Sequence, residues 1–107
     1  MSLSTKPLAV IQAYGVPLAV KAQHYNHGMR LALTLERLDN GAPYGVFTVN
    51  IPDAPLGADE ILVKTWEENT PMRQPMLDTG LFEDTGRRVP AGFCQAEVWR
   101  LTKSLNI

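Results

Sequence analysis

The stretch RLALTLERLDNGAPYGVFTVNI, residues 30–51, contains two runs of alternating apolar residues with a turn between them. In the first run, Leu31, Leu33 and Leu35 share one face, which is the period of a half-buried strand. The second run, residues 44–51, is rich in the aromatic and β-branched residues that favour strands. An Asn-Gly pair separates the runs and tolerates the positive φ angles of a tight turn. The stretch therefore predicts an antiparallel hairpin.

Strand patterns continue on both sides of this hairpin. Upstream, residues 8–24 form two apolar-leaning runs that are separated by Gly15-Val16-Pro17. This pattern predicts a first hairpin, although the alanines in both runs leave a helix open. The remaining expected elements are strands over 60–66 and 93–101, a short helix over about 73–79 that Gly80 ends, and a turn-rich loop over 83–92.

These elements predict an α+β fold for a strand-rich single domain that covers residues 1–107. Its main part is a mainly antiparallel sheet of five or six strands, with one short helix packed on one face. A chain of this length, with 45% apolar and 20% charged residues, can bury one core. Residues 1–6 are expected to be a loose N-terminal segment.

The charge and cysteine content narrow the function classes. A net charge of −1 disfavours a domain devoted to nucleic acid, because phosphate binding needs a clustered positive excess. One cysteine, Cys94, excludes an internal disulfide. The sequence shows neither a signal-peptide pattern nor an apolar run that could span a bilayer. We therefore expect a cytoplasmic protein with no membrane partner.

Asp-Thr-Gly occurs twice, at 78–80 and at 84–86, and is similar to the catalytic motif of retroviral-type aspartic proteases. In such dimers two aspartates share one proton and activate water. The motif of that family lies in the first third of its chain, whereas only the last quarter of this chain follows Gly80. Turn and cap residues are the simpler explanation of both copies. A hydrolase that uses Asp78 is the remote alternative.

No set of residues predicts a metal site or a cofactor. His24 and His27 are three positions apart, so on a strand their side chains point to opposite faces and cannot share a metal ion. In a turn they could, but two histidines and one cysteine make a poor ligand set. Cys94 follows an aromatic residue in an expected strand, where a free cysteine acts as a small hydrophobe rather than a nucleophile. We expect no catalytic residue and no enzyme activity.

The stretch GRRVPAGF, residues 86–93, is the strongest candidate for binding. Two adjacent guanidinium groups on a glycine-flanked loop can clamp a phosphate or a carboxylate. Aromatic side chains beside them can stack a base or pack against a partner protein. The predicted binding residues are Arg87, Arg88, Phe93, Trp66 and Trp99.

Each of these residues also has a structural explanation. The two arginines can pair with Glu83, Asp84 or the Glu67-Glu68 pair, which the acidic neighbours and the total charge favour. The tryptophans can pack in the core or at its rim, with the indole N–H bonded to a partner. An exposed pair of tryptophans would instead indicate an interface.

Four short segments carry a resemblance to a known family: FTVNI at 47–51, TGR at 85–87, GF at 92–93 and AEVWRL at 96–101. Through them, residues 30–102 resemble a family of small uncharacterised bacterial proteins that are carried largely on plasmids and integrated mobile elements. The resemblance implies a cytoplasmic bacterial protein encoded by a mobile element. It supplies no activity and no catalytic residue.

The sequence thus predicts a non-enzymatic binding or protein-interaction module, an accessory protein of a bacterial mobile element. Its partner is expected to be another protein, and its working surface is residues 83–93 with the strand end at Trp66. A weak nucleic-acid binder that uses the Gly86-Arg87-Arg88 loop is the second hypothesis. A homodimer formed through a free sheet edge is also compatible with the pattern.

Overall fold

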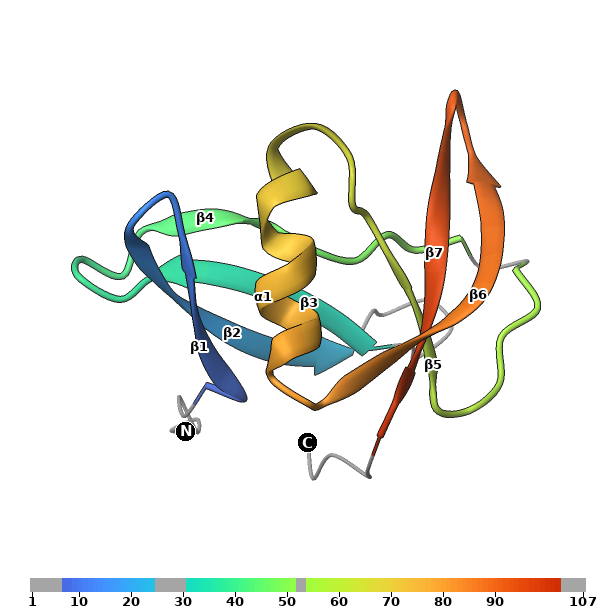
Figure 1. Ribbon diagram of the computed structural model, residues 1–107, viewed down its shortest axis with the longest axis horizontal. Helices are drawn as coiled ribbons and strands as arrows, with labels where there is room; N and C mark the ends of the chain where they lie inside the picture. The colour runs from blue at the N-terminus through green and yellow to red at the C-terminus, as the bar shows by residue number, and fades with distance from the viewer. Residues whose placement is uncertain (1–6, 25–30, 52–53, 103–107) are drawn as a thin grey trace.

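Residues 7–24, 31–51 and 54–102 are described by a computed structural model, and more than half of them lie in strands (Figure 1). A 3₁₀ helix, η1 (Glu67–Met72), leads directly into one α-helix, α1 (Arg73–Asp78). The predicted α+β class is confirmed, and the expectation for residues 1–6 lies outside the described residues. The strands are β1 (Ala9–Ala13), β2 (Val16–His24), β3 (Leu31–Arg37), β4 (Pro43–Val46), β5 (Glu60–Val63), β6 (Phe82–Ala91) and β7 (Cys94–Leu101).

These strands form two antiparallel sheets. The first sheet has the order β1-β2-β3-β4, and the second has the order β5-β7-β6. The predicted single sheet of five or six strands is therefore wrong. The seven described strands divide into four and three, because the chain leaves the first sheet at the end of β4 and continues beside β5.

Residues 47–49 connect the two sheets through main-chain hydrogen bonds. The N–H of Phe47 donates to the carbonyl oxygen of Leu33 on β3 (2.9 Å). The carbonyl oxygen of Phe47 accepts from the N–H of Lys64, which follows β5 (2.7 Å). The second strand of the predicted central hairpin thus ends at Val46 in the first sheet, and its continuation joins the second.

The first hairpin joins β1 to β2, so residues 8–24 are strands and not a helix. Its turn is Tyr14-Gly15, and both residues have positive φ angles, 53° and 75°. Two successive positive φ angles are typical of a type I′ turn, whose twist fits that of the flanking strands. The turn was expected one residue later, at Gly15-Val16-Pro17, but Val16 and Pro17 already belong to β2.

The central hairpin predicted from residues 30–51 is confirmed as the pairing of β3 with β4. Leu31, Leu33 and Leu35 are all buried, on the face that their alternation assigned to the core. Together with apolar residues of β1 and β2, they form the inner face of the first sheet.

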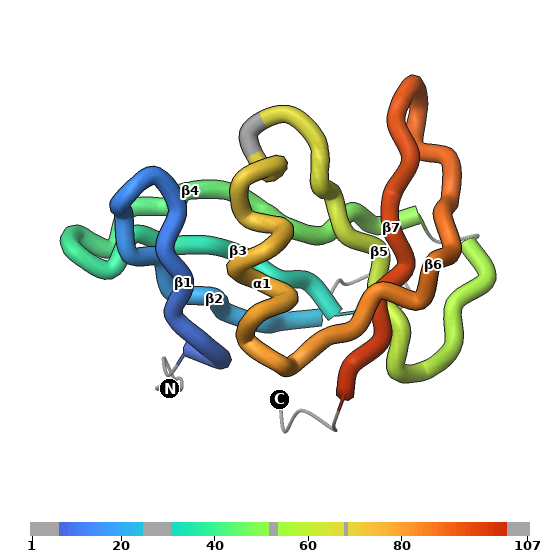
Figure 2. Tube along the Cα trace, in the orientation of Figure 1, coloured from blue at the N-terminus to red at the C-terminus, as the bar shows by residue number. Residues whose placement is uncertain are grey.

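The helix α1 lies across this inner face (Figure 1, Figure 2). Met76 of α1 is fully buried there, as is Met72 at the end of η1. Gly80 has a φ angle of 77°, a left-handed conformation that glycine adopts without strain, and it stops the helix. The helix predicted over about 73–79 is confirmed, whereas the 3₁₀ turn before it was not expected.

Side chains of β7 alternate between two apolar clusters. Trp99 belongs to the main core, where its ring centroid lies 5.4 Å from that of Phe47 and 6.0 Å from that of Phe82. Val98 points to the opposite face and joins a smaller cluster with Leu62. The second sheet is therefore apolar on both faces.

Residues 83–92 are mostly strand, and the turn-rich loop predicted for them is wrong. They form nearly all of β6, which pairs with β7, and the turn comes later at Gly92-Phe93. Gly86 and Pro90 are residues that are typical of turns and loops. An edge strand tolerates both residues, the glycine in a bulge and the proline where no ladder N–H is needed.

Candidate functional site

The five predicted binding residues lie in or beside the second sheet, but they do not share one surface. Arg87 and Arg88 are on β6, Phe93 is in the turn after it, and Trp66 lies between β5 and η1. Trp99 has an exposed fraction of 0%, so its ring is inside the main core, as the structural explanation proposed. The remaining four residues are at least partly exposed.

A bulge, Thr85-Gly86-Arg87, interrupts the pairing of β6 with β7 opposite Val98. The hydroxyl of Thr85 donates to the carbonyl oxygen of Val98 (2.7 Å), and the carboxylate of Asp84 accepts from the N–H of Gly86 (2.9 Å). Gly86 has a φ angle of 87°, which other residues adopt only with strain. The second Asp-Thr-Gly copy therefore has a structural role in the bulge. Its Thr and Asp side chains bond to backbone groups where the main-chain hydrogen bonds between β6 and β7 are interrupted.

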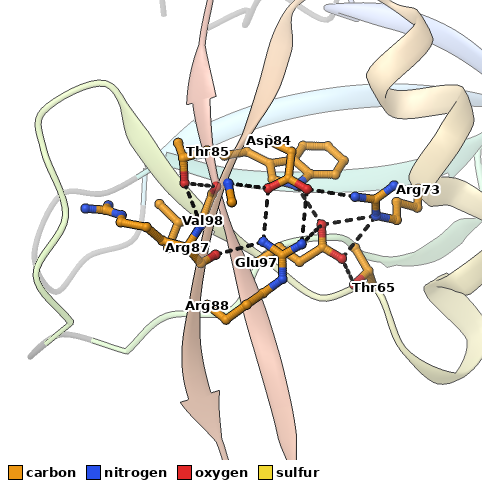
Figure 3. Close-up of polar contacts among 10 residues, drawn as sticks. Thr65, Arg73, Asp84, Thr85, Arg87, Arg88, Glu97 and Val98 are labelled. Carbon is orange, nitrogen blue, oxygen red and sulfur yellow. Dashed lines mark hydrogen bonds and ion pairs between the residues drawn. The ribbon is translucent and has the colours of Figure 1, made fainter.

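The bulge brings Arg88 back to Asp84, and both belong to a network of four charged side chains (Figure 3). Arg88 donates to both carboxylate oxygens of Asp84 (3.0 and 3.1 Å). Arg73 of α1 donates to Asp84 (2.8 Å) and, through Nε, to both oxygens of Glu97 (3.0 and 3.1 Å). Two guanidinium groups and two carboxylates thus neutralise one another.

Glu97 is the most buried member of this network, with 11% of its side chain exposed. Its carboxylate also accepts from the hydroxyl of Thr65 (2.8 Å) and from the indole Nε1 of Trp99 (3.0 Å). Burial on its own raises the pKa of a carboxyl group. The hydrogen bonds from Arg73, Trp99 and Thr65 outweigh that effect and lower the pKa of Glu97. This one side chain therefore ties α1, the end of β5 and the core face of β7 together.

Acid is expected to destabilise the fold through Glu97 and Asp84. The pKa of Asp84 is lowered chiefly by the hydrogen bond from Arg88, against the opposing effect of burial. Because both pKa values are lower in the folded chain, the unfolded chain binds protons more readily. The two carboxylates therefore contribute their full stabilisation above their ordinary pKa values, 3.8 for Asp84 and 4.5 for Glu97. This contribution to the free energy of unfolding is lost as the pH falls through the lowered pKa values of the folded chain. We expect the urea midpoint to decline from about pH 5 downward.

The control for this pH dependence is Glu97→Gln, which cannot titrate at that position. Its urea midpoint is expected to be lower at neutral pH and to change less between neutral and acid pH than that of the wild type. Equal acid sensitivity of the two proteins would contradict the role assigned to Glu97.

Arg87 points away from this network and pairs with Glu60 of β5. The interpretation that the two arginines pair with acidic neighbours is thus confirmed for Arg88, whose partner Asp84 was among those named. The partner of Arg87 was not among them, because Glu60 is distant in sequence and reaches Arg87 only across the sheet. The side chain of Arg87 stays about half exposed, at 51%.

Trp66 and the end of β6 border one apolar surface. Trp66, Val89 and Ala91 pack against the smaller cluster and remain partly exposed. Phe93 follows in the β6–β7 turn and is fully exposed. The buried residues of this cluster are Ala54, Leu62, Ala96 and Val98.

The first Asp-Thr-Gly copy ends α1. The hydroxyl of Thr79 donates to the carbonyl oxygen of Met76 (2.7 Å), and Asp78 accepts from the side chain of Gln74 (2.8 Å). These are contacts of a helix C-terminus, as the turn and cap explanation predicts. They give the hydrolase alternative no support.

The other residues considered from the sequence lie apart. His24 is exposed at the end of β2, whereas His27 is outside the described residues. Cys94 is a half-buried free thiol at the start of β7. Within the described ranges, no group of three or more His, Cys, Asp or Glu side chains is placed to hold a metal ion.

Arg73, Glu97 and Thr65 are site residues that the sequence interpretation missed. Glu97 had a detectable signal, because it stands two positions before Trp99 and so shares the core face of the same strand. A carboxylate at a core-facing position requires charged or hydrogen-bonding partners. Arg73 had no comparable signal, since helix positions of its kind are usually solvated.

Comparisons of the chain with protein-family models, curated proteins and solved structures gave no match. The resemblance to a family carried on mobile elements gains no support from them and stays a prediction. In the part of the chain that the structure describes, no helix is long and apolar enough to cross a membrane.

Proposed function

We propose that this chain is a non-catalytic module that binds another protein through the ring of Phe93, with the partly exposed Trp66, Val89 and Ala91 as further apolar contacts. Phe93 carries the proposal, because its ring is fully exposed. Exposed apolar area of this kind is released from water when a partner covers it. Aromatic residues are enriched at protein interfaces for this reason.

The position of Phe93 supports this role. The β6–β7 hairpin extends beyond the rest of the described fold, and Phe93 is in its turn (Figure 1). A partner can therefore reach the ring without meeting the body of the domain first. Trp66 and Val89 add partly exposed apolar area on the same hairpin and at the neighbouring strand end.

The two arginines favour a protein over a nucleic acid as the partner. Arg88 is paired with Asp84, and Arg87 is paired with Glu60. Phosphate binding depends on positive charge that is not already neutralised by carboxylates. Arg87 is exposed enough to exchange Glu60 for a carboxylate at the rim of a protein interface.

The test is affinity capture from the soluble extract of the source organism, with wild type, Phe93→Ser and Tyr14→Ser as baits. Tyr14 is the matched control, since it is also an exposed aromatic residue in a hairpin turn, at 80%, but belongs to the first sheet. We expect the same protein partner with wild type and with Tyr14→Ser, and its loss with Phe93→Ser.

The captured partner then permits a direct titration. Isothermal titration calorimetry measures the affinity without depending on the tryptophans of the partner. We expect Phe93→Ser to bind at least about 30-fold more weakly, which is the effect of losing an interface hot spot. Unchanged affinity in a folded Phe93→Ser variant would overturn the proposal. A nucleic acid in place of a protein, bound with a steep salt dependence, would support the second hypothesis instead.

We extend this proposal to an accessory role for a bacterial mobile element. The identity of the captured protein tests that extension, because a partner encoded outside any mobile element would contradict it.

A further inference from the structure

The outer face of the first sheet lies on the side away from α1 (Figure 1). Most of its strand side chains are at least partly exposed, whereas Ala19 and Ala32 are buried among their neighbours. Strand alternation places Val10 and Val46 on this face, because their neighbours Ile11 and Phe47 are buried in the main core. Val10 is 51% exposed and Val46 is 48% exposed. They lie on the two outermost strands, β1 and β4.

The centre of the same face holds one pair of opposite charges. Lys21 of β2 and Glu36 of β3 form an ion pair with a distance of 3.1 Å between Nζ and Oε1. They are the only charged residues among the described strand residues of this face, so the face has no net charge. The other described strand side chains of this face are apolar or uncharged polar.

The strand register arranges the two valines and the two charged side chains symmetrically. One row across the sheet runs from Val10 through Ala19 to Glu36, and the next runs from Lys21 through Thr34 to Val46. With strands about 4.8 Å apart and rows about 6.8 Å apart, the Lys21–Glu36 and Val10–Val46 diagonals cross at the same point.

This pattern is complementary to itself. A twofold axis that lies parallel to the face, close to the Val10–Val46 diagonal, carries the position of Lys21 onto that of Glu36. Each lysine of one copy then stands over a glutamate of the other, and each valine stands over its own counterpart. Between them lie Thr34, which is partly exposed, and the small residue Ala19, which is buried among its neighbours and does not project toward the second copy.

We propose that a second copy of this chain docks on this face and forms a twofold-symmetric dimer. In it, Lys21 of one subunit pairs with the partner subunit's Glu36, and the valines at the two corners pack against their counterparts. The dimer does not depend on partner binding at Phe93, which belongs to the other sheet.

Sheet edges provide a poorer route to a dimer than this face. The β6 edge carries the bulge at Gly86 and also Pro90, which has no N–H to donate. The β4 edge is four residues long and begins with Pro43. The β1 edge lies against α1. These features disfavour the edge-to-edge homodimer that the sequence pattern left open.

Charge reversal tests the proposal by sedimentation velocity over a range of protein concentrations. The wild type is expected to be a dimer, whereas Lys21→Glu and Glu36→Lys should each associate about 100-fold more weakly, because like charges then oppose one another. An equimolar mixture of these two variants should form a heterodimer, since every contact across the axis is again between opposite charges. The doubly reversed protein, Lys21→Glu with Glu36→Lys, should also dimerise.

The matched control is Glu83→Lys, which reverses one charge of an exposed cross-strand pair with Arg100 on the second sheet. It is expected to dimerise like the wild type. Circular dichroism and thermal melting show that each variant is folded. A monomeric wild type, single reversals that still dimerise, or a mixture that stays monomeric would each overturn the proposal.

Discussion

Replacing Phe47 by alanine is expected to lower the free energy of unfolding by about 3–5 kcal/mol. Phe47 is fully buried, and its ring packs against Trp99 in the main core. Its backbone bonds to both sheets, so the surrounding side chains cannot collapse into the space without breaking those bonds. Urea denaturation followed by far-UV circular dichroism measures this change.

Phe93→Ala is the matched control, because it makes the same chemical change at a fully exposed position. Its free energy of unfolding is expected to equal that of the wild type. Similar losses in the two variants would contradict the burial assigned to Phe47.

Replacing Glu97 by alanine is expected to have the second largest effect. The change leaves the guanidinium of Arg73 and the indole N–H of Trp99 without their shared acceptor. Breaking a fully buried ion pair costs about 3–5 kcal/mol, and because the arginines are about a third exposed we expect about 2–3 kcal/mol. The same urea experiment measures it.

Two further variants separate charge from hydrogen bonding at this position. Glu97→Gln keeps an acceptor for Trp99 and Thr65 but removes the charge, so its loss should lie between those of wild type and Glu97→Ala. Glu83→Ala breaks an exposed pair with Arg100 and should barely change the urea midpoint. A loss in Glu83→Ala as large as that in Glu97→Ala would contradict the importance of burial.

Local patterns predicted the parts of the fold that depend on neighbours in sequence. Alternation of leucines marked β3, and an Asn-Gly pair marked the turn before β4. The helix before Gly80 was predicted because a glycine that can end a helix directly follows it in the chain. In each case the residues that determine the element lie within a short segment of the sequence, where their spacing can be recognised.

The division into two sheets could not be predicted in this way. It depends on the pairing of Phe47 with Lys64, a contact between distant residues that no periodicity records. The strand β6 was missed for a different reason. Gly86 is typical of a loop when read alone, and only the hydrogen bonds of Thr85 and Asp84 make it part of a strand.

The candidate site was also predicted only in part, because some of its contacts join residues that are distant in sequence. Arg87 and Arg88 were predicted to pair with acidic side chains from composition alone, but Glu60 was not identified because its position follows from strand order. Phe93 directly follows β6 in the sequence, whereas Trp66 lies between β5 and η1. Phe93 and Trp99 have the same position in the alternation, and Phe93 is exposed because it lies in the turn before β7 begins. Sequence patterns locate such strand ends least well.

The strand segment shared by the two sheets has a thermodynamic consequence. Residues 47–49 take part in the pairing of both sheets, so neither sheet can unfold without removing hydrogen bonds from the other. We therefore expect the domain to unfold as one cooperative unit. A ligand that binds only the folded chain stabilises the whole of such a unit. The proposed association through Lys21 and Glu36 is therefore expected to raise the stability of the hairpin that presents Phe93, although that hairpin belongs to the other sheet.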